Sequence, residues 1–182
     1  VLLITIFGLM SSSNGQPTYS YHFCSNQSDN TANTSYQSNL SNLLSSLSSA
    51  AANNTFYENT SSGGIYSLYL CQGDVTTDVC QNCVNSASQE IQKRCPSKKE
   101  AIIWFDECML RYSNTDFSGM EQTFPKVFMW NTQNNTSPNQ TDVDTLALMY
   151  PLITKASSTE MMYAADEAGA GAGSSGSQNR YG

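Results

Sequence analysis

Five of the six cysteines in this chain lie close together, and the sixth lies far upstream. The dense part begins with the spacing Cys71-x8-Cys80-x2-Cys83, and the remaining cysteines are Cys24, Cys95 and Cys108. An even number of cysteines, concentrated in one part of a short chain, is typical of an extracellular domain held together by disulfides. Six cysteines allow many pairings, and the spacing alone does not choose among them.

Two other thiol chemistries fit part of the pattern. Cys80 and Cys83 have the spacing of a thioredoxin-like redox pair, but such a pair belongs at the start of a helix, and here the helix is predicted to begin earlier. A zinc site made of Cys80, Cys83, Cys95 and Cys108 has suitable ligands. An oxidising compartment and the even count favour disulfides, each of which contributes about 2–4 kcal/mol to the stability of a small domain. The cysteines are therefore interpreted as structural, with no metal and no cofactor.

The first residues indicate the compartment. Residues 1–16 combine an apolar run with a Ser-rich segment, which is typical of a secretory signal peptide that has lost its basic start. The apolar run is half the length of about 20 residues that a transmembrane helix needs. We therefore expect a secreted protein or a cell-surface ectodomain, attached to a membrane only if an anchor follows Gly182.

The chain is acidic and poor in charge. Its formal net charge is −7, and 13% of its residues are charged, against a usual fraction of about 25%. Nucleic-acid binding needs a basic surface, so nucleic acid is not an expected partner. The one basic cluster comprises Lys93, Arg94, Lys98 and Lys99, which are interpreted as a solvated helix end, or alternatively as a partner-binding patch.

N-glycosylation sequons lie on both sides of the cysteine-dense segment and not within it. Their asparagines are Asn26, Asn33, Asn39, Asn53, Asn59, Asn134, Asn135 and Asn139. Because glycans need open surface, this placement agrees with a secreted domain whose disulfide-bonded core carries no sugar.

Hydrophobic periodicity outlines an α+β domain. Strand-like segments cover 18–23, 65–71, 101–105 and 108–112, and they alternate with two amphipathic helices near 40–51 and 77–93. Helices that are segregated from an antiparallel sheet define the α+β class.

Polar residues at the ends of the helices suggest their caps. Ser35 is the predicted N-cap of the first helix, and Asn53–Asn54 the predicted stop. The segment Asp74–Asp78 offers polar caps for the second helix, with Asp78 as the predicted cap, and Pro96 ends this helix.

The C-terminal part resembles the first domain in outline. After a linker at 119–141, residues 142–182 contain a helix-like segment with Pro151 inside it, which is expected to kink the helix or mark its end. Leu146–Ala156 corresponds to Leu40–Ala51, and Arg180–Tyr181 corresponds to Ile65–Tyr66. The interpretation is a truncated start of a second copy; an unrelated tail is the alternative.

Residues that could support catalysis are few. His22 is the single histidine, and it lies in an aromatic strand without an obvious nucleophile partner. The carboxylates Asp106 and Glu107 are expected to alternate across a strand, which argues against a paired glycosidase site; Asp74 and Asp78 are close in sequence, but Asp78 is the predicted cap. We therefore do not expect this chain to be an enzyme.

The cysteine spacing, together with the run Trp104-Phe-Asp-Glu-Cys-Met-Leu-Arg-Tyr-Ser-Asn114, closely resembles the plant ginkbilobin-like (stress/antifungal) cysteine-rich domain over residues 18–118. This domain occurs in cysteine-rich receptor-like kinases and in cysteine-rich repeat secretory proteins, often in tandem. The resemblance implies two helices on a five-stranded antiparallel sheet. It also implies the disulfide pairs Cys24–Cys95, Cys71–Cys80 and Cys83–Cys108.

The resemblance also places a sugar site. An antifungal member of the family binds mannose through an Asn, an Arg and a Glu, and the matching positions here are Ser25, Ile102 and Ser113. None of the three residues is retained, so mannose binding is not carried over.

The leading hypothesis is a non-catalytic extracellular module of a cysteine-rich receptor-like kinase or a secretory relative, which binds a protein or carbohydrate in stress or defence signalling. The alternatives are a secreted mannose-binding antifungal lectin and a plasmodesmal adhesion protein. The ligand is not identified. Trp104, Tyr112 and the Lys93–Lys99 cluster are candidates for a surface site, and core packing explains the two aromatic residues equally well.

Overall fold

The computed structural model describes residues 15–26, 31–61, 63–129, 138–168 and 180–181. Most of the predicted signal-peptide remnant, residues 1–14, lies outside this range. The chain divides into two compact units, Val1–Pro125 and Lys126–Gly182.

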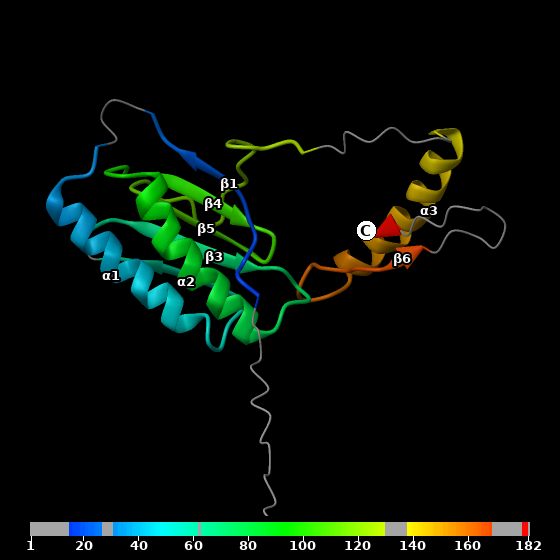
Figure 1. Cartoon of the computed structure of the whole chain (residues 1–182), viewed down its shortest axis with the longest axis horizontal. Coiled ribbons are helices and arrows are strands. Elements are labelled where there is room, and N and C mark those ends of the chain that lie inside the picture. Colours follow the sequence, from blue (N-terminus) through cyan, green and yellow to red (C-terminus); the bar gives the residue numbers. More distant parts are fainter. Residues whose placement is uncertain (1–14, 27–30, 62, 130–137, 169–179, 182) are drawn as a thin grey trace, which may run out of the picture. The chain divides into compact units, whose positions relative to one another are not determined.

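The first unit is a two-layer α+β domain (Figure 1). Its sheet has the strand order β1-β4-β5-β3-β2, and every neighbouring pair is antiparallel. The elements in chain order are β1 (Tyr19–Cys24), α1 (Thr34–Ala50), β2 (Phe56–Thr60), β3 (Tyr66–Cys71), α2 (Thr77–Arg94), β4 (Ala101–Phe105) and β5 (Cys108–Ser113). The predicted class, with two helices on a five-stranded antiparallel sheet, is confirmed.

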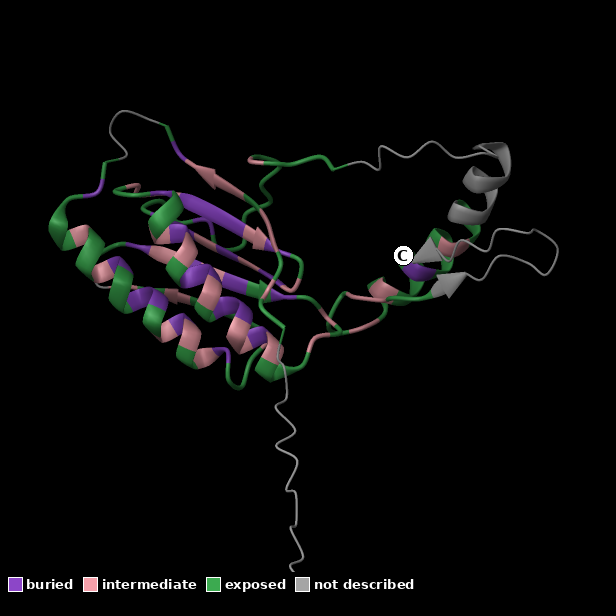
Figure 2. Cartoon of the chain, in the orientation of Figure 1, coloured by how far each residue is buried: buried purple, intermediate pink, exposed green. Residues whose placement is uncertain are grey.

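The core lies between the helices and one face of the sheet (Figure 2). The leucines of α1 that recur every three or four residues are all buried, as the periodicity predicts: Leu40, Leu43, Leu44 and Leu47. On the sheet, alternate residues of β3, β4 and β5 face this layer, and Tyr69, Ile103 and Leu110 are fully buried. Burial of these apolar side chains is the main force that holds the layers together.

The N-caps of both helices differ from the sequence prediction. Helix α1 starts earlier than expected, because Asn33 rather than Ser35 is the N-cap, and its side chain accepts a hydrogen bond from the Tyr36 N–H at 2.8 Å. Helix α2 is capped by Thr76, whose side chain accepts from the Val79 N–H at 3.4 Å. Asp78 lies in the first turn instead, where the helix dipole favours a carboxylate.

The predicted C-terminal end of α1 also lies too far along the chain. The helix ends at Ala50 with Ala51 as its C-cap, before Asn53–Asn54. The Asn54 side chain donates to the Ala50 carbonyl at 3.0 Å and so satisfies one of the backbone groups that the helix leaves open.

Asp106 and Glu107 do not alternate across a strand, contrary to the expectation. They form the turn between β4 and β5, because Trp104 and Met109 are the last paired residues of this hairpin. The Asp106 N–H donates to the Thr18 carbonyl at 2.9 Å, and the Glu107 carboxylate accepts from the Thr18 N–H at 3.0 Å. The turn thereby holds the start of β1 against the hairpin.

All six cysteines form disulfides, and all three bonds end on α2 or its C-cap. They are Cys24–Cys95, Cys71–Cys80 and Cys83–Cys108, which are the pairs that the family resemblance implies. They join α2 to β1, β3 and β5 respectively. No thiolate is left to ligate zinc or to act as a redox pair.

The second unit contains α3 (Pro138–Ser157) and the short antiparallel pair β6 (Glu167–Ala168) and β7 (Arg180–Tyr181). Helix α3 continues through Pro151, so Pro151 does not mark its end. The order helix, strand, strand repeats that of α1, β2 and β3; a truncated second copy at 142–182 and a linker at 119–141 stay predictions. Within the described residues, no helix has the length and apolarity needed to span a bilayer.

Removal of a disulfide should destabilise the first unit by an amount that rises with the logarithm of the length of the loop that it closes. The sequence separations are 71 for Cys24–Cys95 and 9 for Cys71–Cys80. Loop-closure entropy predicts losses of about 4.4 and about 2.6 kcal/mol in the free energy of unfolding for the two paired Cys→Ala variants. Urea unfolding of both variants measures these values. Equal losses would show that native packing around the sulfurs, rather than chain entropy, sets the contribution of each disulfide.

Candidate functional site

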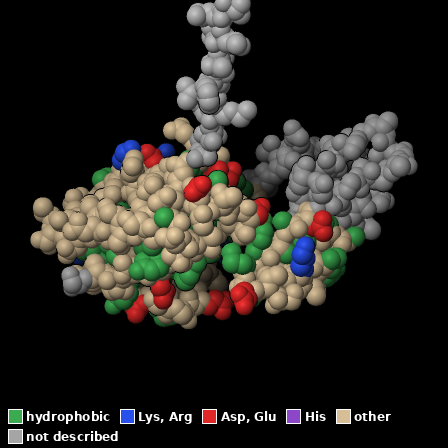
Figure 3. Space-filling view, turned by 90° about the horizontal axis from the view of Figure 1, so that it is seen from below, with side chains coloured by type: hydrophobic (Ala, Val, Ile, Leu, Met, Phe, Trp, Pro, Cys, Tyr) green, Lys and Arg blue, Asp and Glu red, His purple; other side chains and the backbone are tan. Residues whose placement is uncertain are grey.

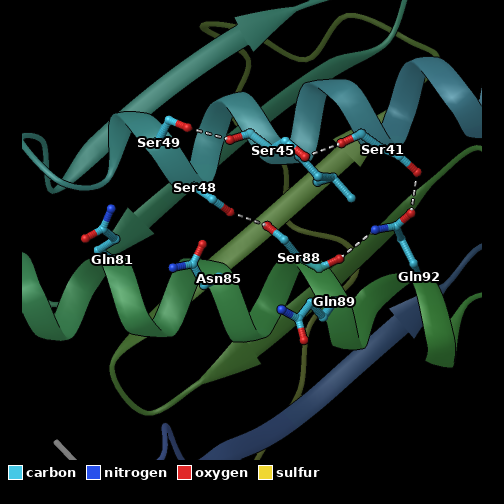
Figure 4. Close-up of a pocket in the computed structure, with 10 residues that line it drawn as sticks. Ser41, Ser45, Ser48, Ser49, Gln81, Asn85, Ser88, Gln89 and Gln92 are labelled. Atoms are coloured by element: carbon cyan, nitrogen blue, oxygen red, sulfur yellow. Dashed lines mark hydrogen bonds between the residues drawn. The ribbon is translucent and has the colours of Figure 1, made fainter.

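A polar groove runs between α1 and α2 on the side of the helices that faces away from the sheet (Figure 4). The two helices are antiparallel, since Ser41 contacts Gln92 while Ser48 contacts Ser88. The groove has a volume of about 350 Å³. Its lining residues are Ser41, Leu44, Ser45, Ser48, Ser49, Gln81, Asn85, Ser88, Gln89 and Gln92.

The serines of α1 and two residues of α2 hold the groove in shape. Ser45 and Ser49 donate their hydroxyl protons to backbone carbonyls four residues earlier, at 2.9 and 3.0 Å. The Ser41 hydroxyl donates to the Gln92 side-chain carbonyl at 2.8 Å, and Gln92 in turn donates to the Ser88 backbone carbonyl at 2.9 Å. The bond between Ser41 and Gln92 ties the two helices together across the groove, whereas the other three bonds lie within one helix.

Three amides line the α2 wall without partners of their own. Gln81, Asn85 and Gln89 follow one another at four-residue steps, so they lie in a row along one face of the helix (Figure 4). Among the described residues, none of their side chains has a hydrogen-bond partner. Each amide offers two donors and one acceptor. The groove can therefore give and accept several hydrogen bonds at once.

Among the residues that the structure describes, no charged one lines the groove. Figure 3 shows one face of the molecule, on which uncharged polar side chains and backbone predominate over charged ones. A charged ligand would lose its hydration in such a groove without gaining an ion pair, which is unfavourable. The chemistry of the groove therefore fits an uncharged ligand that is rich in hydroxyl or amide groups.

This groove is not among the sites predicted from the sequence. The signal was present as serines at four-residue spacing in the first helix and as amides at the same spacing in the second. That pattern also describes any solvated helix face. Only the packing of the two helices brings the two rows together.

The positions that the resemblance assigns to sugar binding are buried. The exposed fractions of Ser25, Ile102 and Ser113 are 3%, 4% and 2%. All three lie near one end of the sheet, where the Ser25 N–H donates to the Glu100 carbonyl at 3.1 Å. Buried small or apolar side chains offer a sugar no exposed donors or acceptors in the manner of an Asn, an Arg and a Glu.

A charged pair that the sequence analysis missed lies next to these positions. Arg111 pairs with Ile102 in the sheet, and its guanidinium lies 3.7 Å from the Glu100 carboxylate. The same guanidinium stacks 4.0 Å above the Phe117 ring and donates to Gln122 at 2.5 Å. Burial lowers the pKa of Arg111, and the Glu100 carboxylate opposes this shift. These contacts hold the segment after β5 against the sheet.

His22 belongs to an aromatic cluster at the edge of the sheet. Its Nδ1 lies 2.6 Å from the Tyr19 hydroxyl, and the Arg94 guanidinium lies 3.9 Å from the Tyr19 ring centroid. The sulfurs of Cys24 and Cys95 are close to the histidine ring. Because these two sulfurs form a disulfide, they cannot act as thiolate ligands, and the cluster is not a metal site.

The basic cluster at the end of α2 is partly neutralised. Lys93 and Arg94 both contact Glu90 at 3.1 Å, and the hydrogen bond from Lys93 holds the pKa of Glu90 below its usual range. The backbone carbonyls of Lys98 and Lys99 accept from the hydroxyls of Tyr112 at 3.2 Å and Tyr36 at 2.7 Å. Tyr112 is thus a buried anchor and not a surface residue, whereas Trp104 lies half-buried on the outer face of the sheet.

The sequons of the first unit lie in different surroundings. Asn26 and Asn53 are exposed, and Asn33 is exposed while it caps α1. Asn39 and Asn59 are half-buried, and the Asn59 side chain donates to the Ser46 hydroxyl at 3.0 Å. Asn134 and Asn135, and the side chain of Asn139, lie outside what the structure describes. Glycosylation of the eight asparagines stays a prediction.

Comparison with known proteins gives one family match. Residues 23–115 match the family described as Salt stress response/antifungal. The sequence is 41% identical to "Cysteine-rich receptor-like protein kinase 25" of Arabidopsis thaliana over 73% of this chain and 21% of that protein. It is 39% identical to "Antimicrobial ginkbilobin-2-like protein" of Castanea crenata over 79% of this chain and 61% of that protein. The chain therefore spans only part of the length of these relatives.

The fold has a counterpart among solved structures. The tandem DUF26 ectodomain of a cysteine-rich receptor-like protein from Arabidopsis thaliana superposes with a TM-score of 0.68, at 21% sequence identity. The match covers 86% of this chain and 74% of that one. At this identity the likeness concerns the fold.

Stability should fall at alkaline pH because of buried tyrosines. Burial raises the pKa of Tyr112 above its ordinary value of about 10, which the unfolded chain retains. The resulting stabilisation is fully present below about pH 10 and is lost as the pH rises further, at up to about 1.4 kcal/mol per pH unit. Urea unfolding from pH 9 to 11 measures this slope, and Tyr112→Phe should reduce it. An unchanged slope in the variant would contradict the assignment.

Proposed function

Because this chain belongs to the Salt stress response/antifungal family, whose domain is a non-catalytic extracellular module, we propose that it perceives a ligand as part of a cysteine-rich receptor-like protein or a secretory relative. Kinase activity in the receptor-like relatives belongs to a separate domain. The family description and the names of the relatives support a role in stress or defence.

The observation that carries this proposal is the uncharged groove between α1 and α2. A wall of hydrogen-bonded serines faces a row of three amides that have no hydrogen-bond partner in the part of the chain that the structure describes. Ligand sites commonly combine a preformed concave surface with a few convergent polar groups. This groove has both features, and one of its two helices, α2, is held to the sheet by three disulfides.

The ligand proposed for this groove is an uncharged, hydroxyl-rich molecule such as an oligosaccharide. Neighbouring hydroxyls on a sugar act as donors and acceptors, and side-chain amides match both roles. Phosphates, carboxylates and cationic ligands are disfavoured, because no lining residue carries a compensating charge. The single apolar lining residue, Leu44, argues against a lipid.

A mannose-binding antifungal lectin is the second candidate. Its support is the similarity to the antimicrobial ginkbilobin-2-like protein. Burial of Ser25, Ile102 and Ser113 weighs against it, since the residues implied for sugar binding are replaced and covered.

Substitution of the groove amides tests the proposal. The double variant Asn85→Ala/Gln89→Ala should lose at least about tenfold in affinity for a neutral oligosaccharide that the wild-type chain binds on an array of plant and fungal cell-wall glycans. The loss is expected because several hydrogen bonds are removed while the helix is kept. Calorimetry of the selected oligosaccharide with both proteins measures the ratio.

Asn82→Ala serves as the matched control. Asn82 lies on the same helix, but its side chain contacts the Gly15 carbonyl at 3.5 Å instead of lining the groove. The Asn82→Ala variant should bind the selected oligosaccharide with the same affinity as the wild type. Binding of mannan that survives the double variant would favour the lectin alternative, and an array without any neutral hit would remove the support for a glycan ligand.

A further inference from the structure

The outer face of the sheet carries a continuous row of apolar side chains that crosses all five strands. Register places Tyr21 opposite Trp104, Trp104 opposite Met109, Met109 opposite Leu70, and Leu70 opposite Phe56. Residues paired across antiparallel strands lie on the same face. We call these five residues the outer row.

The outer row is open to solvent. The exposed fractions of Tyr21, Leu70 and Phe56 are 45%, 47% and 50%, and Trp104 and Met109 are half-buried. The Tyr21 and Trp104 rings lie 6.2 Å apart, so they form a joined surface. A contiguous apolar patch of this kind on a soluble protein commonly marks an interaction site.

The chain itself covers part of the neighbouring row and stops short of the outer row. The covered part is Phe23, Ile102 and Arg111, and the row continues through Leu68 to the exposed Glu58. Phe124 contacts the Phe23 ring edge-on at 5.5 Å, and Phe117, which stacks on Arg111, is 6% exposed. The segment after β5 therefore provides a partial second layer on this face. It leaves the outer row without a cover among the described residues of the first unit.

The charges beside the outer row are mainly negative. Glu58 follows Phe56 by two residues on the same face of β2, and Asp106 and Glu107 form the turn next to Trp104 and Met109. Arg111 follows Met109 closely on β5, but its guanidinium is paired with Glu100. Glu58 has no hydrogen-bond or ion-pair partner among the described residues. An apolar partner with basic flanks would complement this arrangement.

We propose that the outer row docks a basic amphipathic helical segment of a partner protein. Four strand spacings make the row about 19 Å long, which about 13 residues of α-helix span at 1.5 Å each. The opposite face of the same sheet already accepts helices in this manner, through α1 and α2. The site is separate from the groove, which lies on the far side of those helices.

Binding of synthetic helical peptides tests the proposal on the full chain. The probe is a peptide of about 18 residues with Leu on one helical face and Lys on the other. It should bind, and the double variant Phe56→Ser/Leu70→Ser should weaken the binding by at least about tenfold. Glu58→Gln should weaken peptide binding less than the double variant does. It should also make the affinity depend less on salt concentration, since a partly screened charge is removed.

Matched controls distinguish peptide binding at the outer row from nonspecific binding. Tyr57→Ser removes an exposed aromatic from the other face of β2 and should leave binding unchanged, as should the groove variant Asn85→Ala/Gln89→Ala. A Leu/Glu helix and a scrambled Leu/Lys peptide should bind at least about tenfold more weakly. Circular dichroism and thermal unfolding confirm that each variant is folded.

Three results would overturn the proposal. One is equal binding of the Leu/Glu or the scrambled peptide, and another is full binding by the Phe56→Ser/Leu70→Ser variant. The third is a dimer in analytical ultracentrifugation that Leu70→Ser dissociates, because a second copy of the chain would then be the occupant of the outer row.

Discussion

The attachment of α2 to three different strands is the constraint on which the rest of the structure depends. Cys80, Cys83 and Cys95 tie one helix to β3, β5 and β1, so its rotation and its distance from the sheet are fixed at both ends. Helix α1 then packs its leucines beside a helix that cannot shift. A small domain with few charges and a thin core gains most from such links, because they act on the unfolded chain as much as on the folded one.

This fixed layer gives the domain two unlike surfaces. On the helix side, rows of serines and amides meet in an uncharged groove that the Ser41–Gln92 and Ser48–Ser88 hydrogen bonds cross. On the sheet side, the same antiparallel register aligns Tyr21, Trp104 and Leu70 with their neighbours in an apolar row. Hydrogen-bonding ligands fit the first surface and apolar partners the second, so one module can present two separate kinds of binding site.

Much of the fold could be predicted from the residues. The leucine period located α1, and the apolar face of α2 was placed correctly because both patterns face one core. Helix caps were less predictable. Asn33 and Thr76 lie close to Ser35 and Asp78, whose side chains cap helices equally well, and the path of the backbone into each helix decides which residue is the cap. Strand β2 gave no periodic signal, since four of its five residues are exposed at an edge.

The sequence by itself determined the compartment and the α+β class, because these follow from residue types and from spacing along the chain. The disulfide pairs came from the family resemblance alone, since the spacing leaves many pairings open. The tertiary structure alone decided where binding could occur. Gln81 and Ser45 are far apart in sequence but line one groove, and Phe56 and Tyr21 stand at opposite ends of one row. Surfaces of this kind depend on helix packing and strand register, which long-range contacts set and which no local pattern encodes.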